Sequence, residues 1–205
     1  GGIGVDGDIS AAKSSSDTTQ LELGVGSGGG AGGFAPIGGS RALKEAGIPI
    51  DKIGGTSMGS IVAAMLAMDW DYEHMLKQAT SFNYKFDYTF PAVSLTSGSN
   101  LTLGLMERLG DRQIEDLHLN FFCVSTDLSR SSQKMHEKGS LWKYVRASAS
   151  IPGLFPPVID KGSFLVDGGI VNNMPVDIMA KCDDIGTVIA FDVSGSSDLE
   201  TGVEI

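Results

Sequence analysis

The chain has 205 residues, of which 41% are hydrophobic and 20% are charged, so it can bury a core and does not read as a disordered chain. Its formal net charge of −10 argues against a nucleic-acid binder, which presents a basic face to phosphates. The two cysteines, Cys123 and Cys182, have neither CxxC spacing nor a nearby histidine. We therefore expect reduced thiols, with no disulfide scaffold and no metal site.

Composition also predicts the domain boundaries. Residues 1–19 are rich in Gly, Ser and Asp and are expected to form a flexible linker or tail. A single folded domain is expected over residues 20–197, followed by a polar tail at 198–205.

Short apolar strands alternate with helices along this domain. In chain order we predict a strand at 21–25, a helix at 40–46, a strand at 52–54, helices at 58–68, 72–80 and 101–109, a strand at 121–125, a helix at 141–149, a strand at 163–166, a helix at 175–181 and a strand at 187–193. This alternation predicts an α/β fold, a three-layer sandwich with a mainly parallel central sheet.

The strongest chemical signal is the G-x-S-x-G pattern at residues 55–59, between a predicted strand and a predicted helix. A sharp strand-to-helix turn exposes the Ser57 hydroxyl, and the flanking glycines remove side chains that would collide. The helix N-terminus also favours negative charge that develops at the serine. Ser57 is therefore a candidate nucleophile; the competing interpretation is a helix N-cap.

A serine nucleophile needs a base. The three histidines, His74, His118 and His136, lie in contexts typical of surface or hydrogen-bonded core residues. Asp167, at the end of an apolar strand and followed by two glycines, is a candidate instead, because burial would raise its pKa toward that of a usable base. The alternative is that Asp167 only caps a turn.

A glycine-rich loop at residues 24–33 forms the third element. Consecutive glycines can turn their N–H groups inward to bind an anion, either the oxyanion of an ester intermediate or a phosphate. The spacing also matches a dinucleotide fingerprint, although a loop saturated with glycine matches that pattern by chance.

Together these motifs resemble the patatin-like phospholipase family, and more closely its neuropathy target esterase (lysophospholipase) branch. The resemblance rests on the loop Gly28-Gly29-Gly30, on GTSMG at 55–59 and on Asp167-Gly168-Gly169, in the order the family has them. Longer similar stretches are KEAGIPIDKIGGTSMGS (44–60), DRQIEDLHLNFF (111–122), GSLWKYVRAS (139–148) and LVDGGIVNNMP (165–175).

The resemblance implies a patatin-like catalytic domain over residues 20–197 with a Ser57–Asp167 dyad and no catalytic histidine. Amides of Gly28, Gly29 and Gly30 would stabilise the oxyanion. The expected substrates are phospholipids or lysophospholipids, hydrolysed through an acyl-enzyme without metal or other cofactor.

The family also implies a setting for the domain. Its members in this branch belong to longer, membrane-associated chains, which suggests a membrane surface as a partner and a place on the cytosolic side, at the endoplasmic reticulum. The aromatic stretch at residues 82–90 suits such an interface or a loop packed on the sheet.

The glycine loop departs from the family pattern. Gly32 stands where the family normally has a basic residue, and Pro36 where a histidine is common in this branch. Loss of one oxyanion donor can slow a reaction about a hundredfold or more. The alternative function is therefore a catalytically impaired lipid-binding domain of the same fold.

Overall fold

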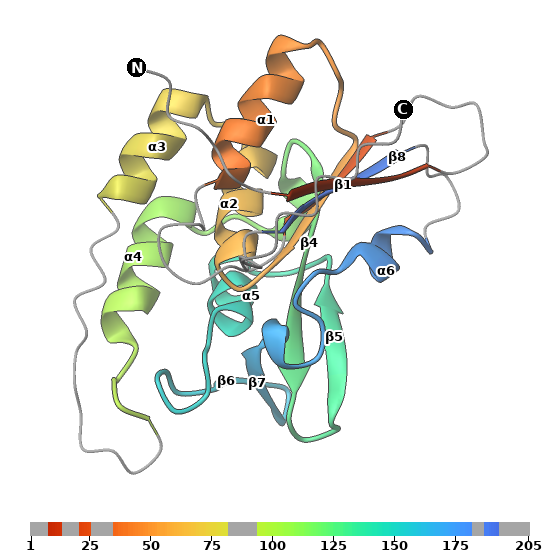
Figure 1. The fold of residues 1–205 in the computed structure, drawn as a ribbon. Helices are drawn as coiled ribbons and strands as arrows, with labels where there is room; N and C mark the ends of the chain where they lie inside the picture. Colours follow the sequence, from red (N-terminus) through yellow and green to blue (C-terminus); the bar gives the residue numbers. More distant parts are fainter. Residues whose placement is uncertain (1–7, 14–20, 26–34, 82–93, 182–186, 193–205) are drawn as a thin grey trace.

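The computed structural model describes residues 8–13, 21–25, 35–81, 94–181 and 187–192 (Figure 1). In this part of the chain, eight strands form one mixed sheet in the order β1-β8-β2-β3-β4-β7-β6, with β5 also paired to β4. The strands are β1 (Asp8–Lys13), β2 (Leu21–Val25), β3 (Lys52–Thr56), β4 (Asn120–Asp127), β5 (Ser132–His136), β6 (Val158–Asp160), β7 (Ser163–Asp167) and β8 (Thr187–Asp192).

The predicted α/β fold is confirmed, with helices on both faces of the sheet. Helices α1 to α5 lie on one face and the short α6 lies on the other (Figure 1). They are α1 (Ala35–Glu45), α2 (Met58–Ala67), α3 (Tyr72–Thr80), α4 (Ser99–Leu109), α5 (Leu141–Ser148) and α6 (Val176–Met179), with 3-10 turns at η2 (Ile114–Asp116) and η3 (Gly168–Ile170).

The sheet is parallel only in its middle. Strands β8, β2, β3 and β4 run parallel, whereas β1, β5, β7 and β6 pair antiparallel with their neighbours. Short turns explain two of the four antiparallel pairs, β4–β5 and β6–β7, because a chain that reverses over a few residues must pair antiparallel. Four residues join β4 to β5, and two residues join β6 to β7.

The N-terminal segment differs from its prediction. Residues 1–19 are predicted to be a flexible linker or tail, but Asp8–Lys13 forms β1, antiparallel to β8. The strand signal of this segment, DISAAK, is weak in the sequence, because its alternation covers only four residues and its apolar residues are mostly small. Helix α1 also begins at Ala35, before the predicted start at residue 40, because its glycine pair weakens the helix signal in the sequence.

The core lies on both sides of β4. Phe121 and Cys123 face a large apolar cluster with α2, α4 and α5, while Phe122 and Val124 face a small cluster beneath α6. This alternation follows from the two-residue repeat of a strand and explains why the continuous apolar run is a central strand. Within the described residues, no helix has the length and apolar character needed to span a bilayer.

Of the two cysteines, Cys123 is a free, fully buried thiol whose pKa is raised by burial. Cys182 and the aromatic stretch at 82–90 lie outside the described residues.

Candidate active site

Ser57 forms the whole turn between β3 and α2. Its backbone has φ 55° and ψ −127°, a conformation that side-chain-bearing residues rarely adopt and that is held only when the surroundings enforce it. The turn is so tight that a Cβ on Gly55 would come within 2.5 Å of the backbone of Gly59. Glycine at position 55 is therefore required by the close approach of strand and helix.

Asp167 approaches Ser57 from the end of β7. The Ser57 hydroxyl donates a hydrogen bond of 2.6 Å to Oδ2 of Asp167. A Cβ on the next residue, Gly168, would lie 2.3 Å from the carbonyl oxygen of Val124, so only glycine lets the chain turn against β4 here. The two residues singled out in the sequence, 110 positions apart, are thus in direct contact.

The Asp167 carboxylate and its peptide are held from several sides. Oδ1 accepts a hydrogen bond of 2.7 Å from the Gly169 N–H at the start of η3. The Asp167 N–H donates to the carbonyl of Ser150 at 2.8 Å, and the Thr126 hydroxyl donates to the Asp167 carbonyl at 2.9 Å. These contacts fix the carboxylate with Oδ2 directed at the Ser57 hydroxyl.

Burial sets the electrostatics of this carboxylate. Asp167 is only 6% exposed, and desolvation raises its pKa above the ordinary aspartate value. The hydrogen bonds from Ser57 and Gly169 act in the opposite direction but are the smaller effects. A carboxylate with a raised pKa is a better proton acceptor near neutral pH.

The backbone of Ser57 has two partners that the sequence analysis missed. The Ser57 N–H donates to the hydroxyl of Ser148 at 2.9 Å, and the Ser57 carbonyl accepts from the hydroxyl of Ser60 at 2.6 Å. The contact to Ser148 spans 91 residues, and no sequence motif marks it.

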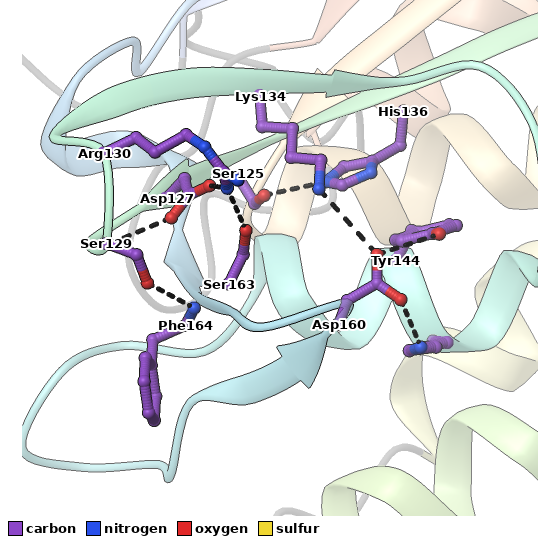
Figure 2. A network of polar contacts seen from close by, with 11 residues as sticks. Ser125, Asp127, Ser129, Arg130, Lys134, His136, Tyr144, Asp160, Ser163 and Phe164 are labelled. Atoms are coloured by element: carbon purple, nitrogen blue, oxygen red, sulfur yellow. Dashed lines mark hydrogen bonds and ion pairs between the residues drawn. The ribbon is translucent and has the colours of Figure 1, made fainter.

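The histidines take no part in this site. In the described part of the chain, no histidine hydrogen-bonds to Ser57 or Asp167, and His74 and His118 are exposed. His136 is buried in the polar network of Figure 2, where its Nε2 and the Ser125 hydroxyl share a hydrogen bond of 2.7 Å.

His136 also stacks on Tyr144, with ring centroids 4.1 Å apart. Desolvation, with the charge of Lys134, lowers the pKa of His136 to about 4, so it is neutral at neutral pH. It is a hydrogen-bonded core histidine, as the sequence context indicates.

A cavity of about 430 Å³ lies at the opposite end of the parallel strands, among α1, α2 and α3. Its lining includes Arg41, Leu66 and Tyr72, and does not include Ser57 or Asp167. Arg41 is already bound to Glu45 at 2.6 Å and lies over the Tyr72 ring. The cavity is thus separate from the serine–aspartate pair.

The predicted oxyanion residues Gly28, Gly29 and Gly30, and the atypical Gly32, lie outside the described residues. Their role stays a prediction.

Comparison with known proteins places the chain in a family. The profile of the Patatin family, described as patatin-like phospholipase, matches residues 25–180. The protein named Lysophospholipase nte1 of Aspergillus niger is 45% identical over 179 residues, which is 83% of this chain and 12% of that protein. Lysophospholipase NTE1 of Phaeosphaeria nodorum is 43% identical over 182 residues, 85% of this chain and 12% of the relative.

A solved structure supports the fold. VipD from Legionella pneumophila superposes with a TM-score of 0.54 at 16% identity, covering 82% of this chain and 50% of that one. The chain spans only about an eighth of the length of the relatives named above (12%). From the profile match and these identities, the chain belongs to the patatin-like phospholipase family.

Proposed function

We propose that the chain is a serine acyl hydrolase that cleaves fatty-acyl esters of phospholipids or lysophospholipids through a Ser57–Asp167 dyad. The observation that carries the proposal is the 2.6 Å hydrogen bond from the Ser57 hydroxyl, on a strained strand-to-helix turn, to a buried carboxylate of raised pKa. The substrate class comes from the family and from relatives named lysophospholipase.

In the first half-reaction, Ser57 Oγ attacks the carbonyl carbon of the ester while its proton passes to Asp167 Oδ2. The tetrahedral intermediate then collapses: the bond to the alcohol oxygen breaks, and that oxygen takes the proton from Asp167. The products are the deacylated lipid alcohol and an acyl group on Ser57.

In the second half-reaction, water gives a proton to Asp167 and attacks the acyl carbon. Collapse of this intermediate releases the fatty acid, and the proton returns to Ser57 Oγ. The amides of Gly28, Gly29 and Gly30 are proposed to bind the oxyanion in both steps, since donors aimed at developing charge contribute most to such reactions.

The proposal includes the setting of the domain. We expect a membrane surface as the source of the lipid, on the cytosolic side at the endoplasmic reticulum, and further domains in a longer parent chain. The length of the relatives, of which this chain covers 12%, supports the last point.

A second candidate is a lipid-binding domain without turnover. It is favoured by Gly32, which occupies the position of the usual basic residue in the glycine loop. This candidate keeps the fold and the lipid site but forms no acyl intermediate.

Intact-mass analysis after reaction with a fluorophosphonate separates the two candidates. We expect one adduct on the wild type, none on Ser57→Ala, and none on Asp167→Asn. The matched control is Ser40→Ala, because Ser40 is also buried and its hydroxyl donates to the Ile37 carbonyl within α1. That variant should be labelled like the wild type.

The absence of an adduct on folded wild-type protein would reject the hydrolase and favour the lipid-binding domain. In that case Gly32→Arg tests whether the missing basic residue is the cause.

A further inference from the structure

The hydroxyl of Ser148 is placed to control the geometry of the proposed nucleophile. Strand β3 ends at Thr56, where its register with β4 also ends, so the next N–H, that of Ser57, leaves the ladder. That N–H donates instead to the side chain of Ser148, at the end of α5. We infer that Ser148 is a positioning residue for Ser57: it holds the peptide in the conformation that directs Oγ at Asp167. This inference rests on the proposed function.

The hydroxyl of Ser148 has a fixed orientation. Ser148 is fully buried, and its single proton is donated to the carbonyl of Val124 at 2.6 Å. Because a hydroxyl has one proton and two lone pairs, a lone pair is then left for the Ser57 N–H. Ser148 thereby connects the nucleophile to the central strand β4.

The same short segment also holds the other half of the dyad. Ser150, two residues after Ser148, accepts the Asp167 N–H on its carbonyl at 2.8 Å. The backbones of Ser57 and Asp167 are thus both anchored to the end of α5. A shift of this segment changes the relation between Oγ and Oδ2 from both sides.

This segment is itself held in place by a buried cation. Arg146 is 4% exposed, and its guanidinium donates to the hydroxyls of Ser150 and Thr102 and to the carbonyl of Pro156. Thr102 lies on α4, so the anchor of the dyad is bound to a second helix.

The strained backbone of Ser57 makes the hydrogen bond to Ser148 important for the proposed reaction. At φ 55°, Ser57 occupies a conformation that relaxes unless its surroundings enforce it. Ser60 holds the carbonyl side of the residue and Ser148 holds the N–H side. Removal of the Ser148 hydroxyl frees one side, and a displacement of about 1 Å at a reacting atom can lower a rate on the order of a hundredfold.

The test compares Ser148→Ala, Ser148→Thr and Ser148→Cys with the control Ser40→Ala. For each, kcat and KM on a soluble short-chain ester, the rate of fluorophosphonate labelling and the unfolding midpoint in urea are measured. We expect Ser148→Ala to lower kcat and the labelling rate by about tenfold to a hundredfold with KM unchanged. The pH at which activity falls should change little, because burial, the largest effect on the pKa of Asp167, is the same in the variant.

The other variants separate positioning from a purely structural role. Ser148→Thr keeps the hydroxyl and should recover most of the rate; Ser148→Cys keeps a weak acceptor and should fall between Thr and Ala. Ser40→Ala should leave kcat unchanged, whatever its effect on stability. If Ser148→Thr does not fold, the test is whether Ser148→Cys is labelled faster than Ser148→Ala.

Unchanged labelling of Ser148→Ala would overturn the inference, as would a loss that neither Thr nor Cys recovers or that Ser40→Ala shares. If the wild type itself is not labelled, the dyad fails and this inference fails with it. If the wild type and Ser148→Ala are labelled at the same rate, the proposed function stands and only the inference about Ser148 is rejected.

Discussion

Acidification should destabilise the protein through His136. In the folded state this side chain is 4% exposed, and desolvation with the charge of Lys134 lowers its pKa to about 4. The groups that face it are the Ser125 hydroxyl, the Tyr144 ring and the charges of Lys134 and Asp160 (Figure 2). The charge of Lys143 acts on it as well. The two lysines oppose protonation and Asp160 favours it.

The direction of the effect follows from proton linkage. The unfolded chain takes up a proton on this histidine below about pH 6.5, whereas the folded protein does so only near the lowered pKa. The stabilisation is therefore fully present above pH 6.5 and is lost as the pH falls. A shift from 6.5 to about 4 corresponds to about 3 kcal/mol in the free energy of unfolding, at about 1.4 kcal/mol for each pKa unit. About 2 kcal/mol of this should be lost by pH 5.

Urea unfolding of the wild type and of His136→Gln at pH 7, 6, 5 and 4 measures this contribution. Other groups titrate equally in both proteins, so the difference in pH dependence isolates His136. The variant is expected to be less stable at pH 7 but to lose about 2 kcal/mol less than the wild type between pH 7 and 5. His118→Gln, a change at an exposed histidine, is the control and should follow the wild type. Parallel curves for the wild type and His136→Gln would refute the argument.

Two further predictions concern the site. Asp167→Asn should abolish ester hydrolysis yet raise the free energy of unfolding at pH 7 by about 0.5–2 kcal/mol, because the buried charge is removed; urea unfolding measures this. This gain in stability should shrink as the pH falls through the raised pKa of Asp167, because the buried carboxylate of the folded wild type is then protonated and uncharged. In the wild type, kcat/KM should fall in acid at a pH above the ordinary pKa of aspartate. A gain in stability that does not depend on pH would contradict this. Gly168→Ala should lower the free energy of unfolding by about 1–3 kcal/mol and reduce turnover, because its Cβ would lie 2.3 Å from the Val124 carbonyl oxygen. Thermal unfolding and an ester assay check this. A variant as stable and active as the wild type would show that the backbone of β4 moves to make room for the Cβ.

The sequence predicted the parts of the site that are encoded locally. Ser57 lies in a five-residue pattern whose first glycine, Gly55, is required by the tight turn, and Asp167 ends an apolar strand before two glycines. Each pattern is visible without knowledge of the partner. Strand β4, which pairs with β3 at Val124 and with β7 at Ser125, brings the ends of those two strands together. Whether this pair performs catalysis stays a prediction.

The residues that support the pair could not be predicted in this way. Ser148 acts through a hydroxyl on a backbone N–H 91 positions away, and Ser150 acts through its carbonyl, which every residue possesses. The edge strands were missed for a related reason. Strands β5 and β6 have five and three residues and alternate little, and their pairing depends on turns and on neighbouring backbone.

The contacts of Ser57 with residues far along the chain also determine when the site forms during folding. During synthesis the turn at Ser57 emerges long before Ser148 and Asp167, which lie 91 and 110 positions later. Contacts of such long sequence separation form late in folding, because a large loop must first be closed. A nascent or truncated chain that ends before β7 thus contains the serine motif and Ser148 but lacks Asp167, its predicted base, and a chain that ends before α5 lacks Ser148 as well. Reactivity at Ser57 can accordingly serve as a reporter of completed folding, more specific than helix content, in any experiment that follows how this chain acquires its structure.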